Sequence, residues 1–193
     1  SSVALSALRE AVSVPVLGVI GPGAARAAAV SPGGAIGVIG QPGTIASGRY
    51  ESHILRARHD ARVYSRATPL LVPLAEEGWM GTEVARLVLR EYLAPLMAKG
   101  IDTLVLGCTH YPLFKDQIRT LFREESGGEV ILVDSAEAIA GSLADMLRQG
   151  DLAATPGRGG GIQCFVTDAP QTFERVGRMF WGGDFPAVGQ VDL

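Results

Sequence analysis

The chain has 193 residues, 47% of them hydrophobic, and a formal net charge of -3. This length can bury a sizeable core, in one large domain or two small ones. Basic residues are scattered and only 6% of residues are aromatic, so no nucleic-acid-binding surface is expected. Two cysteines favour a reducing compartment over a disulfide framework. The apolar runs are too short, and too often broken by Gly or Pro, to span a bilayer. We therefore expect a cytoplasmic protein.

Short β-branched runs alternate with helical patterns along the whole chain. An opening helical pattern runs through Leu5, Leu8 and Val12. Strands are predicted after it at 14–20, 35–40, 61–65, 102–107, 129–134 and 162–167. Several of these runs are apolar without alternation, as in parallel sheets that helices cover on both faces. The sequence therefore predicts an α/β fold with mainly parallel sheets.

Helix and loop signals separate these strands. The spacing of apolar residues predicts a helix over 82–98, and "DSAE" has the spacing of a capping box, with Asp134 as N-cap and Glu137 at N3. Residues 70–81 fit neither a helix nor a strand well. Residues 150–161, "GDLAATPGRGGG", are expected to form a loop before the last strand.

Two glycine-rich segments resemble connections from a strand to a helix. In 19–30, "VIGPGAARAAAV", Arg26 occupies the place of the third glycine of a dinucleotide-binding turn. No acidic residue follows at the distance of a ribose contact, so a plain connection is favoured there. In 37–50, Thr44 lies near the expected helix start, where it could bind a carboxylate or simply cap the helix.

Cys108 is the strongest candidate for a chemical role. In "LVLGCTHYP" it follows an apolar strand and precedes Pro112, which suits a first helical turn. Ligands of open α/β sheets bind at this carboxyl edge, and a helix N-terminus favours a thiolate. His110 could exchange a proton with the sulfur. The alternative is a buried cysteine beside a capping threonine and an unrelated histidine.

The remaining cysteine and histidines point to ordinary structural roles. Cys164 alternates with Ile162 and Val166 on one strand face and is expected in the core. His53 and His59 lie in a polar helical stretch and are expected at the surface. With His110 they give no metal-ligand spacing, so no metal site is predicted.

Five segments together resemble the glutamate racemases of the aspartate/glutamate racemase superfamily. They are "VPVLGVIGPGA", "IGVIGQPGTIASGRY", "PLLVPLAEEGW", "LREYLAPLMAKGIDTLVLGCTHYPL" and "VILVDSAEA". They occur in the family's order across most of the chain. The resemblance implies two similar parallel-sheet α/β domains with the active site between them.

The resemblance also implies a mechanism without any cofactor or metal. Two thiols face opposite sides of the α-carbon of free glutamate, and one removes a proton while the other delivers one. Matched by motif, Cys108 is the thiol acting on L-glutamate and His110 assists it. Glu76 orients that histidine, with Glu77 as the alternative if the register slips by one. Thr109 is expected to bind the substrate.

Thr44, the second threonine of its turn, is expected to bind the substrate as well. Gln41 stands where the family usually has a threonine, so the carboxylate pocket is expected to be altered.

The family's other cysteine belongs to a Cys-Asn-Thr-Ala-Ser motif that runs into a helix like "SSVALSALREA", and we expect that motif before Ser1. Residues 1–20 and 132–193 then belong to an incomplete first domain, and residues 21–131 form the second.

The resemblance implies an enzyme that supplies D-glutamate for peptidoglycan and forms a homodimer when intact, with glutamate as its small-molecule partner. The chain alone is expected to be inactive, because it carries only one of the two thiols. Two alternatives stay open. One is a non-catalytic module that binds a dicarboxylate, and the other is a related racemase acting on aspartate.

Overall fold

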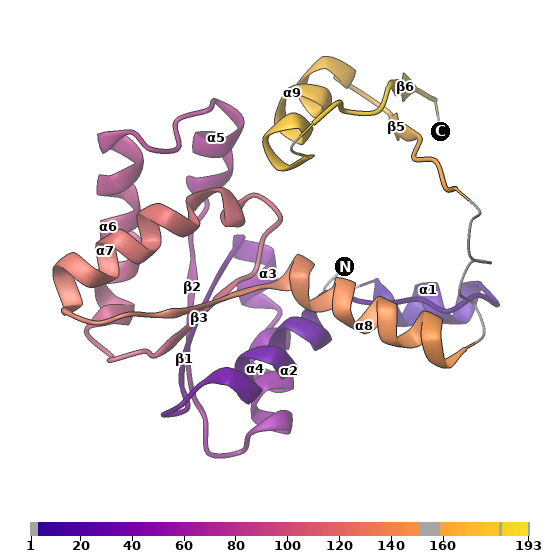
Figure 1. Ribbon diagram of the computed structural model, residues 1–193. Helices are drawn as coiled ribbons and strands as arrows, with labels where there is room; N and C mark the ends of the chain where they lie inside the picture. The colour runs from indigo at the N-terminus through magenta and orange to yellow at the C-terminus, as the bar shows by residue number, and fades with distance from the viewer. Residues whose placement is uncertain (1–3, 151–158, 182, 193) are drawn as a thin grey trace.

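A four-stranded sheet forms the centre of the molecule. The computed structural model describes residues 4–150, 159–181 and 183–192. All four strands run parallel in the order β2-β1-β3-β4 (Figure 1). Their bounds are Ala35–Gly40 for β1, Arg62–Ala67 for β2, Thr103–Leu106 for β3 and Ile131–Asp134 for β4.

Helices cover both faces of this sheet. On one face lie α2 (Ile20–Val30) and α4 (Arg49–Ala57). On the other face lie α5 (Leu71–Glu76), α6 (Glu83–Met97), the 3-10 helix η1 (Tyr111–Phe114) and α7 (Lys115–Ser126). A short helix, α3 (Pro42–Ala46), follows β1 directly. The layered arrangement explains why β1 and β3 are buried over their whole length.

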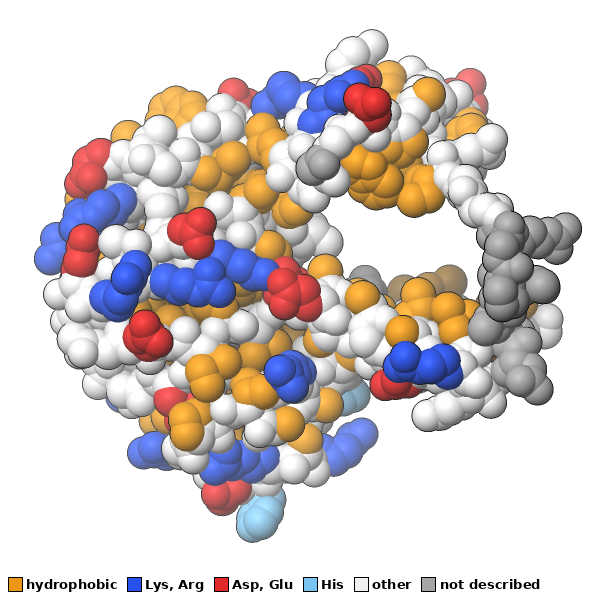
Figure 2. Space-filling view, viewed as in Figure 1, with side chains coloured by type: hydrophobic (Ala, Val, Ile, Leu, Met, Phe, Trp, Pro, Cys, Tyr) orange, Lys and Arg blue, Asp and Glu red, His pale blue; other side chains and the backbone are white. Residues whose placement is uncertain are grey.

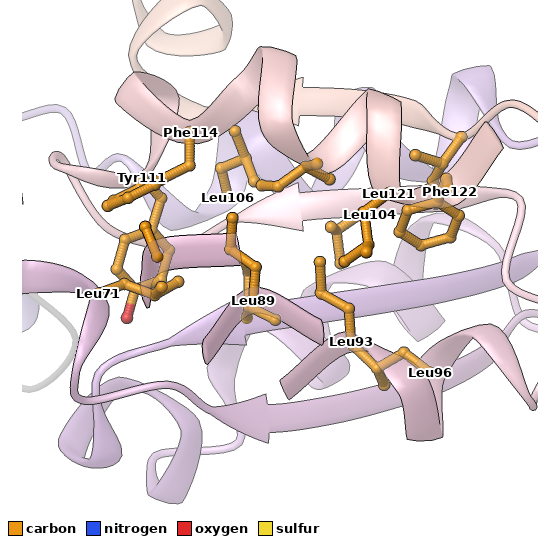
Figure 3. Packing of buried hydrophobic residues seen from close by; sticks show 14 of the residues in the cluster. Leu71, Leu89, Leu93, Leu96, Leu104, Leu106, Tyr111, Phe114, Leu121 and Phe122 are labelled. Carbon is orange, nitrogen blue, oxygen red and sulfur yellow. The ribbon is translucent and has the colours of Figure 1, made fainter. Parts of the chain in front are cut away.

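The period-two alternation of strand side chains divides the core into two parts. Val38 and Val105 point toward α2 and α4, whereas Ile39 and Leu104 point toward α6 and α7. On this second face, leucines of α6 pack against the sheet and against the aromatic side chains of η1 and α7 (Figure 3). The core therefore holds β1 and β3 from both faces.

The remaining elements lie outside this body. Helix α8 (Ser135–Gln149) leaves the end of β4 (Figure 1). Leu5 of α1 (Leu5–Ala11) lies beside Gly18, just before α2. A small C-terminal unit contains β5 (Cys164–Val166), α9 (Pro170–Trp181) and β6 (Val188–Gln190). Its two strands are parallel to each other. In the described parts of the chain, no helix is long and apolar enough to cross a membrane.

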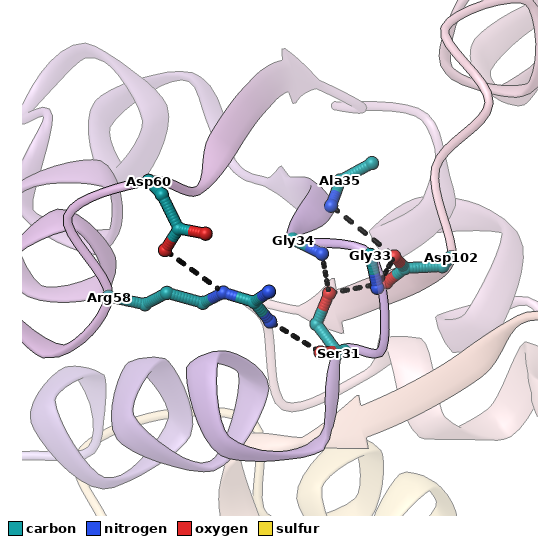
Figure 4. A network of polar contacts seen from close by, with 7 residues as sticks. All are labelled: Ser31, Gly33, Gly34, Ala35, Arg58, Asp60 and Asp102. Carbon is teal, nitrogen blue, oxygen red and sulfur yellow. Dashed lines mark hydrogen bonds and ion pairs between the residues drawn. The ribbon is translucent and has the colours of Figure 1, made fainter.

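A polar network closes the amino edge of the sheet (Figure 4). Asp102 accepts hydrogen bonds from Ser31 Oγ at 2.5 Å and from the N–H of Gly33 at 2.8 Å. Arg58 donates to the carbonyl of Ser31 and pairs with Asp60 at 3.3 Å. These contacts tie the loop before β1 to the start of β3, so the network holds the strand order at the edge away from Cys108.

The α/β class with parallel sheets is confirmed, and five of the six predicted strands are present. The strand expected at 14–20 is wrong: residues 14–18 are irregular, and Ile20 begins α2 and buries its side chain against the sheet. Residues 70–81 do contain a helix, α5, because Leu71 and Ala75 occupy one buried face. The loop expected at 150–161 lies largely outside the described residues, and the division at 21–131 stays a prediction.

The prediction of a capping box at the start of α8 is correct for Asp134 and wrong for Glu137. Asp134 is the N-cap of α8 and accepts a hydrogen bond from the N–H of Ala136 at 2.8 Å. Glu137 instead pairs with Lys115 Nζ at 2.6 Å, and Lys115 also pairs with Asp134 at 2.9 Å. Lys115 thereby joins the start of α7 to the start of α8.

Candidate active site

Cys108 lies two residues beyond β3, at the carboxyl edge of the sheet. The intervening Gly107 donates its N–H to the carbonyl of Ile39 on β1 at 2.8 Å. A β-carbon on Gly107 would lie 2.7 Å from that same oxygen and 3.1 Å from the ring of Tyr50. Only glycine lets the chain pass this close to β1, so the turn carrying Cys108 starts from a tightly fixed point.

His110 lies beside the sulfur. Its Nδ1 atom is 4.0 Å from Cys108 Sγ and 3.3 Å from Thr109 Oγ1. Its Nε2 atom faces Glu76 at the end of α5, with 3.6 Å between Nε2 and Oε1. A carboxylate only accepts, so Glu76 favours the tautomer with a proton on Nε2. In a neutral ring Nδ1 is then the acceptor, and it points at the thiol.

The protonation of Cys108 differs from the sequence-based expectation. Burial raises the pKa of the thiol above its ordinary value, and the carboxylate of Glu76 raises it further. The N–H groups of His110 and Thr109 and the hydroxyl of Thr109 lower this pKa but do not outweigh burial. The expected stabilisation of a thiolate by a helix N-terminus is therefore wrong. Residues 111–114 form only a short 3-10 turn, and α7 starts at Lys115.

A cavity of about 510 Å³ opens beside His110. Glu76, Thr109 and His110 form one wall, and residues of β5 and α9 form the other. Hydrophobic side chains gather on the face of the C-terminal unit turned toward the rest of the molecule (Figure 2). Arg175 on α9 donates to the carbonyl oxygen of Glu76. The C-terminal unit therefore contacts the residue that faces the histidine.

The structure thus brings together four of the five candidates, Cys108, Thr109, His110 and Glu76. It places Glu76, not Glu77, next to the histidine. Thr44 lies at the same edge of the sheet on α3, after β1. Its carbonyl accepts a hydrogen bond from Ser47, and its side chain packs near Gly40 rather than joining the Cys108 group.

Other sequence-based expectations need correction or extension. Cys164 is only partly buried on β5, because the two-stranded sheet is too small to form a closed core around it. Among the described residues, no cluster of three or more His, Cys, Asp or Glu side chains could hold a metal. Arg175, Thr68 and Tyr111 were not among the predicted site residues, and their contacts join positions far apart in the chain. No local pattern marks such contacts.

Comparisons with known proteins identify the family of the chain. The family model for Asp/Glu/hydantoin racemases matches residues 1–143. A glutamate racemase of Geobacter metallireducens is 51% identical over 100% of this chain and 70% of its own length. A glutamate racemase structure from Bacillus anthracis is 36% identical, with a TM-score of 0.89 over 100% of this chain and 70% of that one.

A third relative was solved with a ligand. The glutamate racemase of Francisella tularensis, in complex with D-glutamate, is 30% identical with a TM-score of 0.87. The match covers 99% of this chain and 69% of the Francisella chain.

Proposed function

Because the chain belongs to the Asp/Glu/hydantoin racemase family, and within it to the glutamate racemases, we propose that Cys108 is an acid/base thiol for inversion of free glutamate. The observation that carries this role is the line from Glu76 through His110 to Cys108 at the carboxyl edge of the sheet. A thiol with a histidine acceptor at 4.0 Å and a carboxylate behind that histidine is suited to proton transfer.

The first step concerns the thiol itself. Burial keeps Cys108 protonated at rest, so a base must take its proton before the sulfur can act. His110 Nδ1 is the nearest acceptor, and Glu76 at Nε2 stabilises the imidazolium that forms. The resulting thiolate removes the α-proton of L-glutamate. The C–H bond breaks, an S–H bond forms, and the electron pair stays on the α-carbon.

Inversion is complete when a proton reaches the opposite face of that carbanion. We assign this donation to a second thiol, which the family resemblance places in a Cys-Asn-Thr-Ala-Ser motif that does not occur in these 193 residues. The described site supplies one face only, so we propose that the 193-residue chain exchanges the α-proton of L-glutamate without inverting it. The residues present perform this step with no cofactor, through placement and electrostatics.

The remaining roles follow from position. Thr109 is exposed beside His110 and is assigned to the polar α-substituents of the substrate. Thr44 is one strand away at the same edge and is assigned to a carboxylate. In the cell we propose that the product is D-glutamate for peptidoglycan, made in the cytoplasm by a homodimer.

Deuterium exchange tests this function. The chain is incubated in heavy water with L-glutamate or D-glutamate, and chiral chromatography with mass detection reports inversion and α-deuterium. We expect deuterium from L-glutamate only, and none with Cys108→Ala. Cys164→Ser is the matched control and should exchange like the unmodified chain. Exchange that survives Cys108→Ala contradicts the assignment. No exchange from a folded chain favours the module that only binds a dicarboxylate.

A further inference from the structure

A buried tyrosine directly follows the catalytic histidine. Tyr111 is completely inaccessible to solvent, with its ring among the leucines of α5 and α6 (Figure 3). An unbonded hydroxyl at such a site costs free energy, so its partners define its position. Its partners come from the ends of two strands of the sheet.

Three hydrogen bonds hold the Tyr111 hydroxyl. It donates to the carbonyl of Thr68 at 2.9 Å and accepts from Thr68 Oγ1 at 2.8 Å. It also accepts from Gln41 Nε2 at 3.2 Å. Thr68 follows β2 and Gln41 follows β1, so one phenol joins the carboxyl ends of both strands. We call Gln41, Thr68 and Tyr111 the hydroxyl clamp.

The clamp acts directly on the turn that carries the chemistry. The N–H of Tyr111 donates to the carbonyl of Cys108 at 3.2 Å, which closes the turn from Cys108 to Tyr111. At its other end the turn is fixed by the close contact of Gly107 with Ile39. Both ends of a four-residue segment are therefore tied to β1, directly or through the clamp.

From this geometry we infer that the hydroxyl clamp is a positioning device that holds Cys108 Sγ against His110 Nδ1. The inference rests on the proposed function, since it concerns the same thiol. Gln41 and Thr68 do not touch the reacting atoms, and they act through Tyr111. Gln41 is the residue that differs from the threonine usual in the family. The side chain of a threonine at position 41 would be two bonds shorter. We therefore attribute the hydrogen bond from Gln41 to the Tyr111 hydroxyl to the greater length of the glutamine side chain.

The groups facing Cys108 determine what the clamp should change. His110 Nδ1 lies 4.0 Å from the sulfur, and Glu76 lies behind that histidine. Beyond the effect of burial, negative charge on the sulfur and on Glu76 or the phenols of Tyr50 and Tyr111 repels, which raises the pKa of Cys108 and of both tyrosines. A loosened turn admits water to the sulfur and separates it from His110. Both changes alter the reactivity of the thiol without altering the fold.

The test measures alkylation of Cys108 by iodoacetamide as a function of pH, in a Cys164→Ser background so that one thiol reacts. The variants are Tyr111→Phe, Gln41→Met and Tyr64→Phe. Gln41→Met keeps the length of the side chain and removes its donor. Tyr64→Phe is the control, because it removes one hydroxyl from a half-buried site on β2 outside the clamp. Circular dichroism at each pH confirms that every variant is folded.

We expect Tyr111→Phe and Gln41→Met to shift the pH–rate profile to lower pH and to raise the rate at neutral pH, with Tyr64→Phe unchanged. Deuterium uptake from L-glutamate should fall about tenfold to a hundredfold in Tyr111→Phe, as for a small displacement of catalytic groups. Profiles of Tyr111→Phe and Gln41→Met that superpose on the control overturn the inference. Alkylation can be measured even if the chain shows no deuterium exchange. Failure of the proposed function can therefore be distinguished from failure of this inference.

Discussion

Ionisation of Tyr111 should weaken the fold at alkaline pH. Burial, opposed in part by the hydrogen bond from Thr68, raises the pKa of Tyr111 from 10.0 to about 12. The folded state then holds the phenolic proton more tightly than the unfolded chain does. The associated stability is fully present below pH 10 and is lost as the pH rises toward 12. A shift of two pH units corresponds to about 2.7 kcal/mol in total, of which about 1.4 kcal/mol is lost by pH 11.

Comparison with Tyr111→Phe isolates this contribution. At pH 8 the variant should be about 1–3 kcal/mol less stable, because the carbonyl of Thr68 loses its donor. The variant has no phenol to ionise, so its deficit should shrink by about 1.4 kcal/mol between pH 8 and pH 11. Urea denaturation at four pH values measures both. A deficit that stays constant up to pH 11 refutes the reasoning, and Tyr64→Phe controls for the loss of any tyrosine.

Three further predictions concern His110, Gly107 and Asp102. His110→Asn should slow deuterium uptake from L-glutamate more than any reaction of D-glutamate, and equal slowing would count against a role at Cys108 alone. Gly107→Ala should cost about 1–3 kcal/mol in urea denaturation, because its β-carbon would meet the carbonyl of Ile39. Burial opposes ionisation of Asp102, yet hydrogen bonds led by Ser31 keep its pKa below the usual value. The free energy of unfolding should therefore fall as the pH drops below about 4. This fall should be smaller in Asp102→Asn.

Local patterns were sufficient for most of the sheet. Residues 35–40 and 102–107 are apolar and β-branched without alternation, and both are buried strands in the middle of the sheet. The segment 14–20 has the same composition but forms no strand. A strand needs a neighbour to accept its backbone hydrogen bonds, and none of the described residues pairs with this segment. Composition shows that a segment can be a strand, whereas pairing decides whether it is one.

The site was predictable to the extent that the motif is contiguous. Cys108, Thr109 and His110 are adjacent in sequence, so their proximity follows from the turn itself. Glu76 came from the family resemblance, because 34 positions separate it from His110 and only the packing of α5 brings them together. Tyr111 and Arg175 carried no signal. A tyrosine in an apolar run predicts only a core residue, and a single arginine on an amphipathic helix predicts only a surface residue.

The protonation of Cys108 was mispredicted for a physical reason that bears on the mechanism. Sequence places the thiol before a helix, and the helix terminus should favour the thiolate. The structure shows that burial outweighs the nearby N–H groups. A thiol that stays protonated needs a base within reach of its proton, which is the task of His110 with Glu76 behind it. Because Cys108 is partly buried, its distance from His110 depends on the position of the turn. Partial burial of the thiol raises its pKa, and the hydroxyl clamp fixes the turn on which the same thiol lies.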